Sequence, residues 1–162
     1  MDFSIGFGIA IAGGALTAGM GATGASIGVG LAGEMAAGVL SEDPDKFGQM
    51  LILQALPATQ SIYSLVVAIL VMVKLNVLGG TGGMYDLPLA KGIAIFASCL
   101  PSILGQLVSA IWQGRASVGA MGLVARRPDA FGKAVILPAM VETFALLSLI
   151  ATILFLMIAV QL

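Results

Sequence analysis

The chain has 162 residues, of which 59% are hydrophobic and only 9% are charged, whereas soluble domains carry roughly 25% charged residues. Its mean hydropathy is +1.10 and its net charge is −1, so the composition excludes an ordinary water-soluble domain and implies no nucleic-acid partner. Histidine is absent and Cys99 is the only cysteine, which excludes a disulfide framework and the common zinc and histidine-based catalytic sites.

Three polar interruptions, at residues 41–46, 76–86 and 125–129, divide the sequence. They leave four apolar segments, at 5–40, 47–75, 87–124 and 130–161. Each segment exceeds the about 20 residues that cross a bilayer core as a helix. We therefore predict an all-α membrane protein of four transmembrane helices. The chain start lacks the basic region of a signal peptide, so we expect the first helix to belong to the mature protein.

Basic residues are unevenly distributed among the three interruptions. Only two flank the middle one, Lys74 and Lys91. Five lie on the side of the first and third, namely Lys46, Arg115, Arg126, Arg127 and Lys133. Basic residues concentrate on the cytoplasmic side of membrane proteins. We therefore expect the two short Pro-Asp loops to be cytoplasmic and both termini to lie outside.

The sequence repeats itself after 84 residues. Pro44-Asp45-x-Phe47-Gly48 matches Pro128-Asp129-x-Phe131-Gly132. The matches continue with Ile52-Leu53 on Ile136-Leu137, Thr59 on Thr143, and Ser64-Leu65 on Ser148-Leu149. The Pro-Asp-x-Phe-Gly match argues against a chance alignment of apolar sequence. We predict two duplicated helical hairpins, residues 1–78 and 79–162. Glu142 aligns with Ala58, so only the second hairpin carries a carboxylate at this depth.

Glycine is concentrated in the first segment, which includes the spacing Gly24-x-x-x-Gly28. Small residues allow membrane helices to approach one another closely. We expect this helix to be crowded on several faces and to line the interior of a homo-oligomer. The alternative is that it packs only within its own protomer.

Glu142 is the most informative residue of the chain. It follows Asp129 by 13 residues, which corresponds to about 20 Å of helix and places it near the bilayer midplane. An unpaired carboxylate there costs about 2.5 to 3.5 kcal/mol, so it must be protonated, paired with a cation or hydrated. Glu34 lies only seven residues before the first loop, and we expect it to be a solvated structural residue near the interface.

Polar groups on the second and third helices suggest what Glu142 binds. Gln113 on the third helix lies at a compatible depth. On the second helix, side chains spaced i, i+3, i+4 and i+7 share one face, at Leu56, Thr59, Gln60 and Tyr63. Pro57 disturbs the hydrogen-bond ladder there and can free a backbone carbonyl. Together these groups form an all-oxygen set of the kind that hard cations prefer. The alternative is that they are interhelical hydrogen bonds that serve packing alone.

Three motifs in this duplicated frame resemble a known family. They are Leu56-Pro57-Ala58-Thr59-Gln60-Ser61-Ile62-Tyr63, Gln113-Gly114 and Val141-Glu142-Thr143. The chain is similar, over essentially its whole length, to the sodium-dependent rotor-ring subunit, or proteolipid K subunit, of bacterial V-type ATPases. The resemblance implies that Glu142 binds the ion with the side chains of Thr59, Gln60 and Gln113 and the carbonyl of Leu56, while Tyr63 orients the carboxylate. Ala58 stands where glycine is common in the family.

The resemblance also implies a mechanism and a set of partners. Identical subunits form a closed ring in the bacterial cell membrane, with the first and third helices in the inner layer and lipids around it. Each site carries Na⁺ past a stator subunit with an essential Arg, while a central stalk turns the ring. The chain contains no nucleotide-binding motif, so it is not an enzyme on its own and ATP hydrolysis belongs to partner subunits.

Two functional alternatives stay open at this point. The first is a proton-carrying ring of the same type. The second is a small glutamate-dependent multidrug or cation antiporter, although a drug pocket favours more than the 6% aromatic residues found here. A purely structural four-helix protein would leave Glu142 unexplained.

Overall fold

The computed structural model describes residues 4–79 and 86–161 as a bundle of long helices. The chain start and most of the middle glycine-rich loop, on which the sequence predictions also touched, lie outside these ranges. The helices are α1 (Ile5–Glu42), α2 (Phe47–Ala55), α3 (Thr59–Lys74), α4 (Leu89–Arg126) and α5 (Phe131–Gln161). Short 3-10 turns occupy Pro44–Lys46, Leu56–Ala58 and Pro128–Ala130.

The prediction of four transmembrane helices is confirmed. The spans that are long and apolar enough are Ile5–Glu42, Pro44–Lys74, Leu89–Arg126 and Pro128–Ala159. The second of these is α2 and α3 in line, joined by the 3-10 turn Leu56–Ala58. A helix satisfies its own backbone hydrogen bonds, which lipid cannot do, and this explains why the apolar segments fold as continuous helices.

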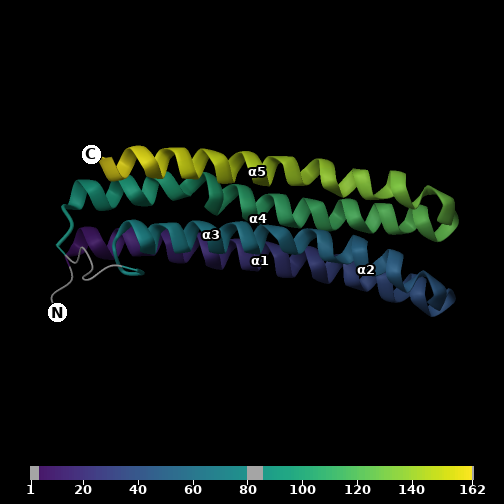
Figure 1. The fold of residues 1–162 in the computed structure, drawn as a ribbon. Helices are drawn as coiled ribbons and strands as arrows, with labels where there is room; N and C mark the ends of the chain where they lie inside the picture. Colours follow the sequence, from purple (N-terminus) through teal and green to yellow (C-terminus); the bar gives the residue numbers. More distant parts are fainter. Residues whose placement is uncertain (1–3, 80–85, 162) are drawn as a thin grey trace.

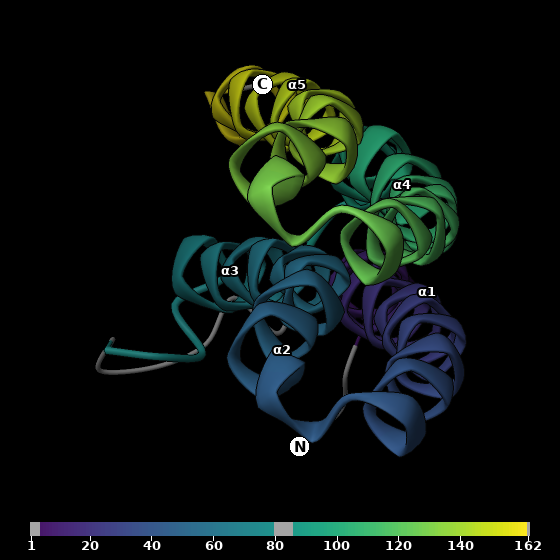
Figure 2. The same ribbon diagram turned by 90° about the vertical axis from the view of Figure 1, so that its right-hand side faces the viewer.

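The helices form two layers, as the views along and across the bundle show (Figures 1 and 2). α1 and α4 lie side by side and run in the same direction, and their contact is the most extensive in the protomer. α2 and α3 pack on α1, and α5 packs on α4, so these elements make up the second layer.

The loops between paired helices are short and held at one end of the bundle. Pro44 and Pro128 each begin a 3-10 turn, where the missing N–H of proline costs no hydrogen bond. Lys46 donates to the carbonyl of Ala125 at 2.9 Å and forms an ion pair with Asp43 at 3.1 Å. The first loop is thereby tied to the end of α4.

Glycines set the close approach of α1 to α4. A Cβ at Gly24 would collide with the backbone of Leu107, and one at Gly28 with the carbonyl of Ala110. Gly114 on α4 would in turn collide with the backbone of Gly28. Each of these positions therefore has room for hydrogen only.

The two hairpins share one small-residue contact at equivalent positions. In the first hairpin Gly21 of α1 packs against Ser64 of α3, and in the second Gly105 of α4 packs against Ser148 of α5. Both residues of the second pair follow those of the first by 84 positions. This equivalence supports the predicted duplication in three dimensions.

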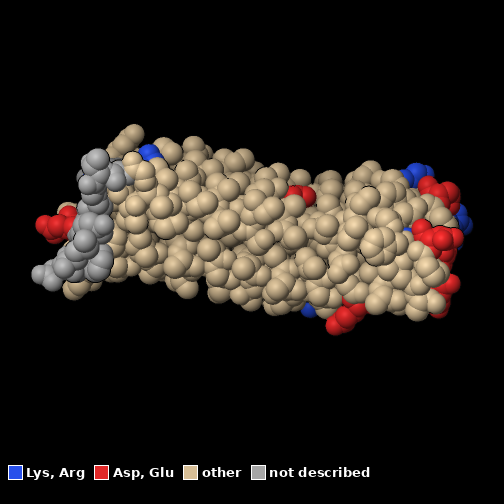
Figure 3. All heavy atoms as spheres, turned by 60° about the horizontal axis from the view of Figure 1, so that its bottom comes forward, with Lys and Arg blue, Asp and Glu red and all other residues tan. Residues whose placement is uncertain are grey.

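A single protomer leaves much apolar surface uncovered. Only 17% of the most apolar stretch of the span Pro128–Ala159 is buried within the chain, against 44% for the span that contains α4. Figure 3 shows that charged groups gather near the ends of the bundle and are sparse between them. This surface suits lipid and neighbouring subunits rather than water.

Candidate ion-binding site

Glu142 lies partly buried on α5 and is bonded to two other helices. The Tyr63 hydroxyl of α3 donates a hydrogen bond of 2.7 Å to Oε1 of Glu142. The Gln113 amide of α4 donates to Oε2 at 3.5 Å. The carboxylate therefore joins both hairpins in the middle of the bundle.

Two fully buried glutamine amides extend this network. Nε2 of Gln60 donates to Oε1 of Gln113 and, at 3.3 Å, to the hydroxyl of Ser109. Ser109 donates in turn to the carbonyl of Val141, next to the carboxylate, at 3.2 Å. A continuous chain of polar groups thus runs from α3 through α4 to α5.

A third group of oxygens lies where α2 meets α3. Pro57 is buried in the 3-10 turn Leu56–Ala58 that interrupts the α-helix. The Thr59 hydroxyl donates to the carbonyl of Leu56 at 3.0 Å and lies 3.3 Å from Oε1 of Gln60. The irregular turn therefore brings a backbone carbonyl, a hydroxyl and an amide oxygen together.

The structure connects all six residues predicted for the site. Tyr63 and Gln113 contact Glu142 directly, while Gln60 reaches it through Gln113. Thr59 is connected to this network by its hydrogen bond to Gln60, and Leu56 by the hydrogen bond that its carbonyl accepts from Thr59. The side chains come from α3, α4 and α5, so a single protomer contributes every one of them.

Ser109 is a site residue that sequence reasoning missed. It lies four residues before Gln113 and so shares its helix face, a spacing that could have indicated it. A second network between α4 and α5 was also missed. There Gln106 donates to the carbonyl of Ala145 and the hydroxyl of Ser148, at 2.9 and 3.0 Å.

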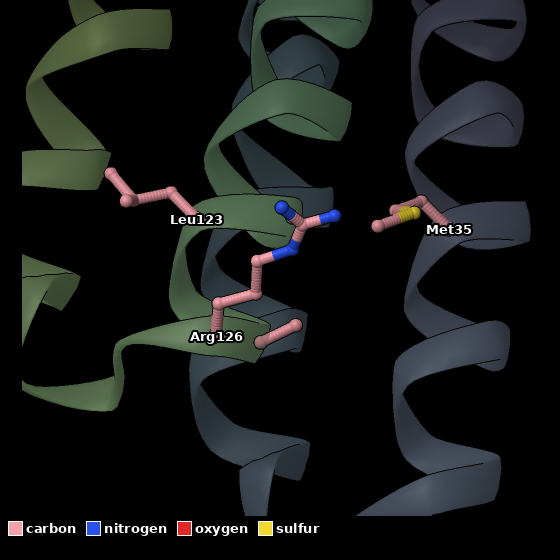
Figure 4. A pocket seen from close by; sticks show the side chains of 5 residues that line it. Met35, Leu123 and Arg126 are labelled. Carbon is pink, nitrogen blue, oxygen red and sulfur yellow. The ribbon is translucent and has the colours of Figure 1, made fainter.

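Two surface grooves were also found, one away from this network and one that borders it at Ser109 and Val141. One, of about 350 Å³, is lined near the loop end by Met35, Gly122, Leu123, Ala125 and Arg126. Figure 4 shows the Arg126 side chain extending from α4 toward Met35 on α1. None of these five described lining residues is acidic, so this groove does not suit a cation. The other, of about 320 Å³, lies on the flank of α4 and α5 and includes Trp112 and Phe144.

Comparison with known proteins gives a consistent result. Residues 5–71 and 96–155 match the model of the ATP synthase C subunit family. The chain is 36% identical over 127 residues to the V-type sodium ATPase subunit K of Enterococcus hirae, covering 78% of this chain and 76% of that one. It is 38% identical over 144 residues to the A-type ATP synthase subunit K of Methanocaldococcus jannaschii, covering 89% of this chain and 60% of that one.

The fold agrees with these similarities, since the chain has four helices able to span a membrane and a carboxylate in the middle of the bundle. Proteins of this kind form homo-oligomeric rings that move ions through the membrane, and catalysis takes place in other parts of the ATPase. This protein, a multi-pass membrane component of such a ring, belongs to the ATP synthase C subunit family.

Proposed function

We propose that this chain forms the rotor ring of a V-type rotary ATPase and that each protomer carries one Na⁺ on Glu142. The main observation in support is the set of oxygen-bearing groups around a single carboxylate. A proton site needs only the acid, whereas a hard cation needs several oxygen ligands. The name of the Enterococcus hirae relative, a sodium ATPase subunit, agrees with this ion.

In this proposal Na⁺ is held by Glu142, the side chains of Thr59, Gln60 and Gln113, and the carbonyl of Leu56. The Gln113 amide now donates to the carboxylate. Turning this amide would present its oxygen to the cation and would break the hydrogen bond that this oxygen accepts from Gln60, so Gln60 must rearrange with it. Tyr63 does not bind the ion but fixes the carboxylate through its 2.7 Å hydrogen bond.

The arrangement of the layers fits a ring with α1 and α4 inside and α2, α3 and α5 outside. Glu142, on α5, then lies toward the outer circumference, within reach of a stator. Bound Na⁺ neutralises the carboxylate and so permits its exposure to lipid. An Arg of the stator displaces the ion, while a central stalk couples the rotation to ATP hydrolysis in partner subunits.

Carbodiimide labelling tests the identity of the ion. Hydrophobic carbodiimides react with a protonated carboxyl group, so bound Na⁺ should protect Glu142. We expect labelling of purified rings to fall as Na⁺ is added at constant ionic strength, with choline as the replacement cation. Rings of the Glu142→Gln variant provide the control, since without this carboxylate no labelling that responds to Na⁺ should remain.

The same experiment separates Na⁺ from H⁺. A proton ring would show labelling of Glu142 that follows pH alone and ignores Na⁺ at every pH. That outcome would overturn the sodium assignment and favour the proton-carrying ring.

We also propose the membrane orientation given by the basic residues, with the Pro-Asp loops in the cytoplasm and both termini outside. Ser41 is exposed at the end of α1 and is a suitable site for a reporter cysteine. In a Cys99→Ala background, Ser41→Cys should resist a membrane-impermeant maleimide in intact cells and react after permeabilisation. Reaction in intact cells would reverse the orientation.

A further inference from the structure

Two oppositely charged residues lie away from the loops and outside the ion site. Glu34 on α1 and Arg115 on α4 are both exposed in the protomer. The only ion pair among residues 4–79 and 86–161 joins Lys46 to Asp43, so neither of these two has a charged partner there. Such charges are costly at membrane depth unless they are paired or hydrated.

The contacts between α1 and α4 show how far along the bundle axis each of these two charges lies. Gly24 packs on Leu107 and Gly28 on Ala110, so a residue of α1 lies level with one about 83 positions later on α4. Glu34 is therefore only about two residues, or roughly 3 Å, from the level of Arg115. Arg115 itself lies two residues from Gln113, which contacts Glu142. Both charges therefore lie on the loop side of Gln113, close to its level along the bundle.

The Arg115 side chain lies on the flank of α4 that faces away from α1. Its guanidinium lies 4.7 Å from the ring centroid of Trp112, a cation-π contact. Trp112 is 54% exposed and lines the groove on the flank of α4 and α5, together with Phe144. The positive charge is thereby held on a flank of α4 that the protomer leaves uncovered.

Glu34 lies on an exposed face of α1 that contains several small residues beside the larger Leu16 and Ile27. Gly8, Gly19 and Gly30 recur every 11 residues on this face, and a Cβ at any of them would meet open space. A period of 11 residues keeps positions on one side of a helix. Glu34 follows Gly30 by one turn. This face differs from the one that packs on α4 through Gly24 and Gly28.

We propose that the exposed small-residue face of α1 packs against the α4 flank of the next protomer and that Glu34 pairs with Arg115 across each boundary. Two different flanks of one chain then carry opposite charges at the same level, which is the arrangement a head-to-tail ring requires. Exposed apolar side chains on α4 of one protomer, such as Leu104 and Val108, can fill the space beside the glycines on α1 of the next. The proposal rests on the ring and not on the identity of the ion.

Cross-linking between protomers tests this pairing. The residues joined by an Arg–Glu pair are too far apart for a disulfide, so a short bis-maleimide is the suitable reagent. In a Cys99→Ala background, the double variant Glu34→Cys/Arg115→Cys should yield a ladder of dimers and higher oligomers on denaturing gels. Co-expression of chains that each carry one of the two cysteines should yield dimers only.

A matched control uses Glu34→Cys with Lys91→Cys, which lies near the start of α4 at the opposite end of the bundle. This pair should give no oligomer ladder. Cross-links confined to single chains, or none in rings shown to be intact by native mass spectrometry, would overturn the proposal.

Charge reversal provides the second test and decides the question if the cysteine variants do not assemble. Glu34→Arg or Arg115→Glu alone should cause loss of most intact rings in detergent, because each places like charges at every boundary. The double reversal Glu34→Arg/Arg115→Glu should recover them. If the double variant lost as many intact rings as expected from adding the losses of the two single variants, the pairing would be contradicted.

Discussion

Glu142 receives hydrogen bonds from Tyr63 and Gln113, which belong to different helices. Its carboxylate therefore links α5 to α3 and α4 through hydrogen bonds. In the site that we propose, Glu142 provides the charge, Tyr63 orients the carboxylate, and the other residues provide neutral ligands. Substitutions should separate these roles.

Glu142→Gln should abolish Na⁺ binding, because the amide keeps the shape of the side chain but removes the charge that balances the cation. Equilibrium binding of radioactive sodium to purified rings measures this directly. Thr143→Ala is the matched control, since Thr143 is exposed and its hydroxyl bonds only to the carbonyl of Met140 one turn earlier. Sodium binding retained by Glu142→Gln would show that another residue carries the ion.

Thr59→Ala and Gln113→Ala should be milder, since each removes one neutral ligand and leaves the carboxylate. We expect the affinity for Na⁺ to fall by about fivefold in each, because one hydrogen bond or neutral ligand contributes about 1 kcal/mol and about 1.4 kcal/mol is a factor of ten. Sodium titrations of carbodiimide labelling measure the change. An affinity unchanged in both variants would exclude these side chains from the coordination sphere.

At the scale of elements, glycine decides how closely α1 approaches α4. Gly28→Ala places a methyl group against the backbone of Ala110 and the ring of Pro57, and the backbone of α4 cannot yield without moving as a whole. We expect a destabilisation of about 1 to 3 kcal/mol, typical of overpacking, measured as thermal unfolding in detergent. Gly48→Ala, at a helical glycine with open space around it, is the control and should be neutral or slightly stabilising.

The contact between α4 and α5 should depend on a buried threonine. Thr152 is fully buried and accepts a hydrogen bond of 3.0 Å from the backbone N–H of Ser102, which directly follows Pro101 inside α4. Thr152→Val keeps the shape but removes the acceptor, at a cost of about 1 kcal/mol in the free energy of unfolding. Thr143→Val on the exposed face should cost less, and equal effects would argue against a special role for Thr152.

The sequence predicted the elements better than their contacts. Apolar runs identified all four spans, because lipid leaves helical hydrogen bonding as the only solution, and the predicted ends lie within about two residues of those observed. Spacing on one helix also predicted the group of Leu56, Thr59, Gln60 and Tyr63. Ser109 was missed although its spacing from Gln113 places both on one helix face, whereas the role of Gln106 depends on how α4 is aligned with α5, which the sequence alone does not reveal.

At the scale of the whole molecule, the uncovered apolar surface and the family both require assembly. We expect native mass spectrometry in mild detergent to find a closed ring of identical protomers. Particles of one or two protomers would contradict the ring. Gly28→Leu should prevent its formation, because the protomer itself could no longer pack α1 on α4.

The pairing of Gly21 with Ser64 and of Gly105 with Ser148 has a consequence for the energetics of the motor. The two hairpins are geometric equivalents, yet Ala58 occupies the position that corresponds to Glu142. If Glu142 is the only carboxylate that carries an ion, as we propose, a ring of given circumference holds one ion per four helices rather than one per two. Each revolution moves half as many ions for the same ATP hydrolysed, so the free energy available per ion doubles. With one acid in each duplicated pair of hairpins, fewer ions would be transported per ATP hydrolysed, and the ring could move them against a steeper ion gradient.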